Sequence, residues 1–154
     1  MNREEFYKMF SDTYIIQDRD EFFWLFYKVA MIKPIIIVEL GVEQGGTLRF
    51  WNELVPKDEG LVIGIDFDST VPDKICWNWR DGRVKILIGN TTDPETVARL
   101  KILLDGRKID FLFIDASYTT EKMQHQWEVC EKEFEMYSPL VRPGGLIGFH
   151  DLGD

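Results

Sequence analysis

Short apolar runs alternate along the chain with longer segments in which apolar residues recur at helical spacing. The apolar runs cover residues 35–40, 61–66, 84–88, 111–115 and 145–150. Runs of this length, bounded by glycine, proline or polar residues, are typical of strands that are buried on both faces of a parallel sheet. Because helical segments separate these strands, the pattern predicts an α/β fold with right-handed crossover connections.

Helices are predicted between the strands over residues 46–55, 94–104 and 120–137, and a further helical segment over 3–32. Asp93 is suited to cap the helix over 94–104, and Pro94 is suited to its first position. In the helix over 120–137, apolar residues at alternating spacings of four and three define one face. We expect this face to be core rather than a metal or cofactor site, and it comprises Met123, Trp127, Cys130, Phe134 and Tyr137.

The length of 154 residues indicates a single domain over residues 1–154, with a helical segment over 1–32 and a sheet-containing core over 33–154. The formal net charge is −9. This charge argues against a nucleic-acid partner, because binding to a phosphate backbone needs a basic face. A neutral or cationic ligand is compatible with it.

The sequence predicts a cytoplasmic protein without a membrane partner. The first ten residues lack the apolar region of a signal peptide. Charged residues and a proline at positions 28, 33, 34 and 39 interrupt the most apolar stretch, residues 22–40, so it is too polar to cross a bilayer as one span. Cys76 and Cys130 lie far apart without metal-type spacing and are expected to be reduced thiols.

A glycine-rich segment follows the first predicted strand and leads into a helix. It reads Glu-Leu-Gly-Val-Glu-Gln-Gly-Gly-Thr over residues 39–47. Its glycines Gly41, Gly45 and Gly46 allow a tight turn and a close approach of the backbone to a ligand. The helix that follows directs its N-terminal amides toward the same place. Three residues separate Gly41 from Gly45, so the spacing differs from the Gly-x-Gly-x-x-Gly pattern of dinucleotide-binding proteins.

Every other predicted strand also ends at a polar residue. Asp66 ends the second strand, Asn90 lies shortly after the third, Asp115 ends the fourth, and His150 and Asp151 close the fifth. In open parallel sheets, ligands bind beyond the carboxyl ends of the strands, so these residues are expected to line one site. An acidic residue roughly 20 positions after the glycine-rich segment typically accepts hydrogen bonds from a ribose diol. Asp66 is the candidate for that role.

Three features together resemble class I S-adenosylmethionine-dependent methyltransferases: Glu-x-Gly-x-x-x-Gly-Gly over 39–46, the acidic residue after the second strand, and Pro-Gly-Gly over 143–145. The closer resemblance is to the subgroup related to cephalosporin-hydroxylase-like and rhamnosyl O-methyltransferases. It covers residues 30–151 and is most specific over 137–151, where the subgroup has Tyr-x-Pro-Leu-Val-x-Pro-Gly-Gly-x-Ile-x-x-His-Asp. The resemblance implies a Rossmann-like, doubly wound parallel sheet in strand order 3-2-1-4-5.

The resemblance also implies S-adenosylmethionine as the cofactor and methyl transfer to a hydroxyl of a small molecule or saccharide. Positioning of the acceptor would supply most of the rate of an in-line displacement at the methyl group. The resemblance implies that the methionine part of the cofactor lies against Glu39, Gly41, Gly45 and Gly46. It implies that Asp66 holds the ribose and that Asn90 faces the adenine, with Asp115 as a further contact.

Asp115, His150 and Asp151 are candidates for the reaction itself. Related metal-dependent O-methyltransferases place an aspartate after strand four and polar ligands after strand five, which implies a Mg²⁺ or Mn²⁺ site of Asp115, His150 and Asp151. Alternatively, His150 is a general base for the acceptor hydroxyl, with Asp115 beside it. In a third interpretation the two aspartates line the pocket and cap turns.

One segment departs from the subgroup pattern. Where its members have Asp-Gly-x-His-x-Tyr-Glu, this chain has Asp-Ala-Ser-Tyr-Thr-Thr-Glu over residues 115–121. The lost histidine favours an alternative function, a degenerate domain that binds S-adenosylmethionine or a partner without catalysis. A nicotinamide-dependent enzyme on the same sheet is a further alternative, against which the glycine spacing argues.

The end of the sequence carries an expectation about assembly. Class I methyltransferases normally continue past strand five with a helix and an antiparallel strand pair, which this sequence would lack. Strand five would then be an edge with the apolar run Leu-Ile-Gly-Phe over 146–149. Such an edge pairs with another chain unless it is covered. The sequence therefore predicts either a homo-oligomer or a fragment of a longer protein.

Overall fold

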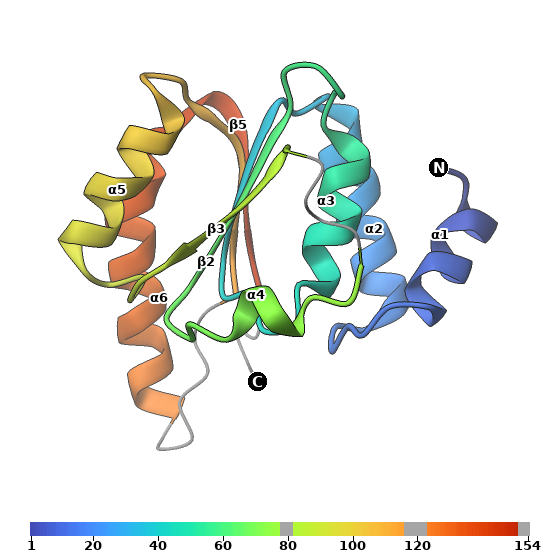
Figure 1. The fold of residues 1–154 in the computed structure, drawn as a ribbon, viewed down its shortest axis with the longest axis horizontal. Coiled ribbons are helices and arrows are strands. Elements are labelled where there is room, and N and C mark those ends of the chain that lie inside the picture. Colours follow the sequence, from blue (N-terminus) through green and yellow to red (C-terminus); the bar gives the residue numbers. More distant parts are fainter. Residues whose placement is uncertain (78–81, 116–122, 151–154) are drawn as a thin grey trace.

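The computed structural model describes residues 1–77, 82–115 and 123–150. For residues 123–126 it describes the backbone only. Its sheet has the order β3-β2-β1-β4-β5, and every neighbouring pair is parallel. Helices cover both faces (Figure 1). The predicted Rossmann-like α/β fold and its strand order are confirmed. The strands are β1 (Ile36–Leu40), β2 (Leu61–Asp66), β3 (Val84–Ile88), β4 (Ile109–Ile114) and β5 (Val141–Phe149).

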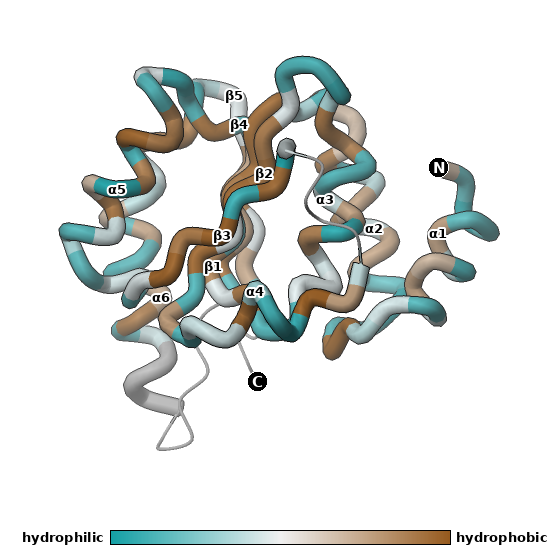
Figure 2. Tube along the Cα trace, in the orientation of Figure 1, coloured by the Kyte–Doolittle hydropathy of each residue, from teal (hydrophilic) through white to brown (hydrophobic). Residues whose placement is uncertain are grey.

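Two layers of helices enclose the sheet. The first layer holds α1 (Arg3–Ser11), α2 (Arg19–Met31) and α3 (Gly46–Leu54), and the second holds α5 (Pro94–Leu104) and α6 (Met123–Tyr137). The short α4 (Val71–Lys74) follows β2, and the 3₁₀ turn η1 (Ser138–Leu140) precedes β5. All residues of β1, β2 and β4 are buried, as expected for strands covered on both faces. Figure 2 shows these central strands as the hydrophobic centre of the molecule.

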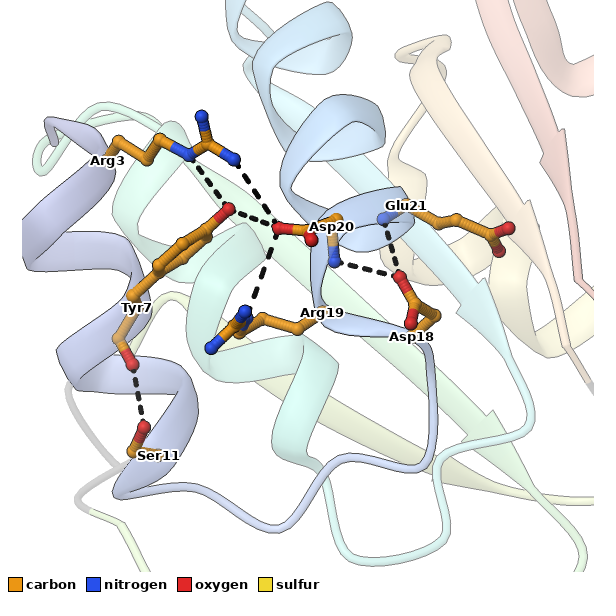
Figure 3. A network of polar contacts seen from close by, with 7 residues as sticks. All are labelled: Arg3, Tyr7, Ser11, Asp18, Arg19, Asp20 and Glu21. Atoms are coloured by element: carbon orange, nitrogen blue, oxygen red, sulfur yellow. Dashed lines mark hydrogen bonds and ion pairs between the residues drawn. The ribbon is translucent and has the colours of Figure 1, made fainter.

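An aromatic cluster joins the N-terminal helices to the sheet layer. Phe6 of α1 is fully buried, and its ring centroid lies 4.7 Å from that of Phe50 in α3. Polar contacts hold α1 on α2 at the surface (Figure 3), where Tyr7 donates to Asp20 and Arg3 donates to the Tyr7 hydroxyl at 2.8 Å. The predicted helical segment over 3–32 is thus two helices that pack as part of the core.

Asp110 joins three strands at the end of the sheet where β1 begins. Its Oδ2 accepts hydrogen bonds from the amides of Ile35 and Ile36, both at 2.8 Å, and its Oδ1 accepts from Arg142 Nε of β5 at 2.5 Å. Burial works against the charged form of Asp110, but the hydrogen bonds from Arg142 and the two amides outweigh it. The pKa of Asp110 is therefore lowered from its usual value.

The core prediction for α6 is partly wrong. Cys130 and Tyr137 are buried as expected, but Trp127 is 53% exposed and Phe134 is 41% exposed. The side chain of Met123 lies outside the described residues. Trp127 and Phe134 lie on a stripe rotated by about 60° from that of Cys130 and Tyr137, since each helical residue advances by about 100°. The face that meets the sheet is centred on the second stripe and includes Glu133, which is fully buried.

β5 is longer than predicted and lies at the edge of the sheet. It begins at Val141, whereas the predicted run begins at residue 145, so Pro143 and Gly144 lie within the strand. The register between β4 and β5 shifts next to this segment, where Gly144 has a φ of 76°. Phe149 is 37% exposed. Within the described ranges, no helix is both long enough and apolar enough to span a membrane.

Candidate functional site

The loop between β1 and α3 has left-handed backbone at three positions. Gly41 has a φ of 86° and Gly45 a φ of 68°, while Glu43, which is not a glycine, has a φ of 52°. Glycine adopts this conformation without steric cost, whereas other residues are strained there. The Gly41 amide donates to the carbonyl of Ile65 at 2.9 Å, which fixes the loop against the end of β2.

Neighbouring segments hold the loop from two sides. Trp77 donates from Nε1 to the carbonyl of Gly45 at 2.9 Å. On the other side, a Cβ at position 46 would lie 1.9 Å from the carbonyl oxygen of Tyr14. The glycine at Gly46 is therefore required by the segment between α1 and α2, a reason that the cofactor interpretation of the sequence did not include. Arg49 of α3 anchors the same segment by donating to Thr13 Oγ1 at 2.7 Å.

Asp66, the last residue of β2, organises the loop from beneath. Its Oδ2 accepts from the amides of Val42 and Glu43 at 2.8 and 3.1 Å, and its Oδ1 accepts from the amide of Asp68 at 2.9 Å. A carboxylate offers about four lone-pair sites, so about one acceptor site is left for a ligand. Asp66, which the sequence predicts as a ribose ligand, therefore also stabilises the glycine-rich loop.

Glu39 of β1 is 1% exposed and is bonded to α3 through both oxygens. Oε1 accepts from Thr47 Oγ1, and Oε2 accepts from Trp51 Nε1 at 2.5 Å. Burial raises the pKa of Glu39 well above its usual value, and the charges of Asp115 and Asp66 act in the same direction. Glu39 therefore fixes α3 on the sheet under the loop, and its effect on a ligand would pass through that loop.

Asn90 and Thr91 form the loop between β3 and α5. Asn90 is exposed, and its Oδ1 accepts from both the amide and the hydroxyl of Thr92 at 3.0 Å, which is an Asx turn. This turn leaves the NH₂ group of the Asn90 side chain as the donor that a ligand would meet. Thr91 is buried and is bonded to α6 through Glu133 and Tyr137.

The structure brings Asp115 and His150 together at the ends of the adjacent strands β4 and β5. His150 Nδ1 lies 3.0 Å from Asp115 Oδ1. Gln17, from the segment between α1 and α2, donates through Nε2 to Asp115 Oδ2 at 2.6 Å. Gln17 was missed from the sequence because 98 positions separate it from Asp115 and no motif marks it. The third predicted metal ligand, Asp151, lies outside the described residues.

In the described part of the chain, no three histidine, cysteine, aspartate or glutamate side chains are grouped as a metal site. Asp115 and His150 supply two of the three predicted ligands. Their chemistry, a carboxylate and an imidazole, fits Mn²⁺ better than Mg²⁺, which prefers oxygen ligands. The metal site stays a prediction.

Three carboxylates, those of Glu43, Asp66 and Asp115, lie around the glycine-rich loop. Burial raises the pKa of Glu43, the charges of Asp115 and Asp66 raise it further, and Lys74 opposes them. Glu39 is affected by the same two aspartates. The carboxyl ends of β1, β2 and β4 therefore create a negative potential, which favours a ligand that carries positive charge.

A model of a methyltransferase domain family matches residues 38–152. The chain therefore belongs to this family of methyltransferase domains, which confirms the class suggested by the sequence motifs. A comparison with curated protein sequences gave no match.

Solved structures of O-methyltransferases share the fold. A Staphylococcus aureus protein assigned as a caffeoyl-CoA O-methyltransferase has a TM-score of 0.68 at 22% identity, over 96% of this chain and 64% of that one. A Bacillus cereus O-methyltransferase in complex with S-adenosylhomocysteine has a TM-score of 0.64 at 19% identity, over 94% and 63%. TomG of Streptomyces achromogenes is an O-methyltransferase of tomaymycin synthesis, solved in complex with S-adenosylmethionine. It has a TM-score of 0.64 at 15% identity, and the match covers 96% of this chain and 65% of TomG. The chain thus spans less than two thirds of the length of these proteins.

Proposed function

We propose that the chain binds S-adenosylmethionine and transfers its methyl group to a hydroxyl of a small molecule or saccharide. The observation that carries this proposal is the acidic loop region formed by Glu43, Asp66 and Asp115. S-adenosylmethionine carries a positive sulfonium centre, which such a region attracts. A nicotinamide dinucleotide carries an anionic pyrophosphate, which the same carboxylates repel.

The described residues fit the parts of this cofactor. The left-handed backbone at Gly41 lets the loop approach a ligand closely without a side chain there, whereas the space beside Gly45 is taken by Ile75. The acceptor capacity left on Asp66 suits a ribose hydroxyl, and the NH₂ group of Asn90 suits a ring nitrogen of adenine. Two of the similar structures, the B. cereus and S. achromogenes enzymes, hold S-adenosylhomocysteine or S-adenosylmethionine.

His150 and Asp115 would assist the acceptor. When bound, S-adenosylmethionine supplies an electrophilic methyl group. Because His150 Nδ1 faces the Asp115 carboxylate, the neutral imidazole carries its proton on Nδ1 and is basic at Nε2. In this proposal, Nε2 accepts the proton of the acceptor hydroxyl, and the Asp115 carboxylate stabilises the imidazolium that forms. Gln17 holds the other carboxylate oxygen.

Isothermal titration with S-adenosylmethionine, S-adenosylhomocysteine and NAD tests the cofactor. We expect NAD to bind much more weakly than the other two, and tighter binding of NAD than of S-adenosylhomocysteine would overturn the proposal. Glu43→Gln removes a charge beside the loop. It should weaken S-adenosylmethionine about two- to fivefold more than the neutral S-adenosylhomocysteine, as expected for a solvent-exposed charge pair. The matched control is Glu59→Gln, which removes an exposed carboxylate outside this loop.

Formation of S-adenosylhomocysteine in the presence of sugar and phenol acceptors tests the transfer. For an accepted substrate, His150→Gln should lower kcat about a hundredfold or more, the usual contribution of a general base, with the KM for S-adenosylmethionine unchanged. An unaltered kcat in this variant would remove His150 from the reaction. Cofactor binding without transfer to any acceptor would favour the alternative of a binding domain.

A further inference from the structure

Buried polar contacts fasten the loop after β3 to α6. Thr91 donates from Oγ1 to Oε1 of Glu133, and its carbonyl accepts from the hydroxyl of Tyr137 at 2.9 Å. Glu133 and Tyr137 are both fully buried, and they lie about one turn apart on the face of α6 that meets the sheet. Thr91 directly follows Asn90, the predicted adenine contact. The position of this part of the cofactor site is therefore set from α6, behind the loop.

Glu133 is poorly matched to its surroundings as an anion. Its Oε2 is buried and has no hydrogen-bond partner among the described residues. A buried polar atom without a partner is costly, and a buried charge without a counter-ion is more so. Among the described residues, the titratable groups whose charges act in this cluster are acidic or neutral: Asp115 at the end of β4, Asp93 at the start of α5, and Cys130 on α6 itself.

These surroundings shift the equilibrium of the carboxyl group toward its neutral form. Burial raises the pKa of Glu133 to about 7, the hydrogen bond from Thr91 opposes this shift, and the charge of Asp115 adds to it. An ionised Glu133 gains free energy by reaching water. It reaches water only if the contact between α6 and Thr91 opens, because the carboxyl group has no exposed surface in the closed arrangement.

We propose that Glu133 is a positioning residue for the cofactor site: it holds the loop over residues 89–93 in place through Thr91 while its carboxyl group is protonated, and releases the loop when it ionises. The inference rests on the proposed function of this loop in cofactor binding. The cofactor would then be held best below neutral pH. Glu133 acts only through Thr91 and takes no part in methyl transfer.

The contact between Glu133 and the loop over residues 89–93 is tested in the ligand-free protein by hydrogen exchange of a peptide that covers this loop. Wild type is compared at pH 6 and pH 8 with Glu133→Gln, which keeps an oxygen for Thr91 but does not ionise. Linkage between the pKa of about 7 and the ordinary value of 4.5 predicts that loop opening in wild type, relative to the variant, rises about tenfold between these pH values. Glu131→Gln, an exposed neighbour on α6, is the control and should behave as wild type. If the ratio of loop opening in wild type to that in Glu133→Gln is the same at pH 6 and pH 8, the inference is overturned.

S-adenosylhomocysteine titrations on the same proteins test the link to the cofactor. Wild type should lose affinity relative to Glu133→Gln as the pH rises from 6 to 8, and a constant ratio would reject the positioning role. If wild type binds no S-adenosylhomocysteine while loop exchange still responds to pH, the proposed function fails and the tie between Glu133 and the loop stands.

A second pair of variants covers the case in which Glu133→Gln does not fold. Thr91→Val removes the hydroxyl that reaches Glu133, whereas Thr91→Ser keeps it. Thr91→Val should speed exchange of the 89–93 peptide already at pH 6, and Thr91→Ser should not. Identical exchange in these two variants would overturn the inference.

Discussion

Removal of the Asp66 side chain tests whether one carboxylate shapes the whole glycine-rich loop. Asp66→Ala deletes the acceptor for three backbone amides, those of Val42, Glu43 and Asp68. Val42 is buried, so its amide would lose its partner out of reach of water, at a cost of about 1–3 kcal/mol. Glu43 is exposed, and water can replace the lost bond there. The free energy of unfolding should therefore fall by about 1–3 kcal/mol.

The affinity for S-adenosylhomocysteine should fall as well, by about 1–3 kcal/mol, because the proposed ribose contact would lose its acceptor and the loop would lose its support. Urea unfolding measures the first effect and isothermal titration the second. Asp68→Ala is the matched control: it removes the next carboxylate along the chain, whose contacts with Thr70 and Lys74 are exposed and screened. A folded Asp66→Ala protein with the stability and affinity of wild type would refute the reasoning.

Three further predictions concern other parts of the molecule. Asp110→Asn should lower the free energy of unfolding by about 2 kcal/mol at neutral pH, since a charged acceptor bridging three strands is lost. Because the pKa of Asp110 is lowered by folding, this difference should shrink in urea unfolding as the pH falls below 4, and a constant difference would contradict it. Anomalous diffraction after a Mn²⁺ soak should show a peak between Asp115 and Asp151, with His150 as a third ligand, whereas a peak elsewhere or none at saturating metal would leave these residues as pocket lining. Light scattering at several concentrations tests whether the edge of β5 pairs with a second copy of the chain, and a monomer with robust methyl transfer would contradict the edge argument.

The elements that the sequence predicted well share a strong local cause. The runs over 61–66 and 84–88 match β2 and β3 at both ends. Continuous apolar residues mark the fully buried β2, whereas the edge strand β3 is only partly buried and contains the exposed Lys85. The glycine-rich loop was equally readable, since left-handed backbone at Gly41 and Gly45 leaves glycine as the residue of lowest cost.

The parts that the sequence did not reveal depend on contacts between distant segments. Gln17 reaches Asp115 because α1 and α2 pack against α3. No motif or spacing in the sequence predicts that contact. Nothing in the sequence marks Glu133 as buried, because charged side chains are almost never fully buried unless paired. The exposure of Trp127 follows from how α6 is rotated on the sheet, which tertiary packing decides and helical periodicity alone does not.

The family match begins at residue 38, whereas the hydrophobic core begins at Phe6. Removal of the residues before position 38 would expose the aromatic side chains of Phe50 and Trp51. It would also remove Gln17, whose side-chain amide donates to Asp115. In an exchange of segments between relatives, the first 37 residues therefore cannot be treated as a neutral leader. A graft of the core without its own N-terminal helices would change both the exposed apolar surface and the surroundings of Asp115.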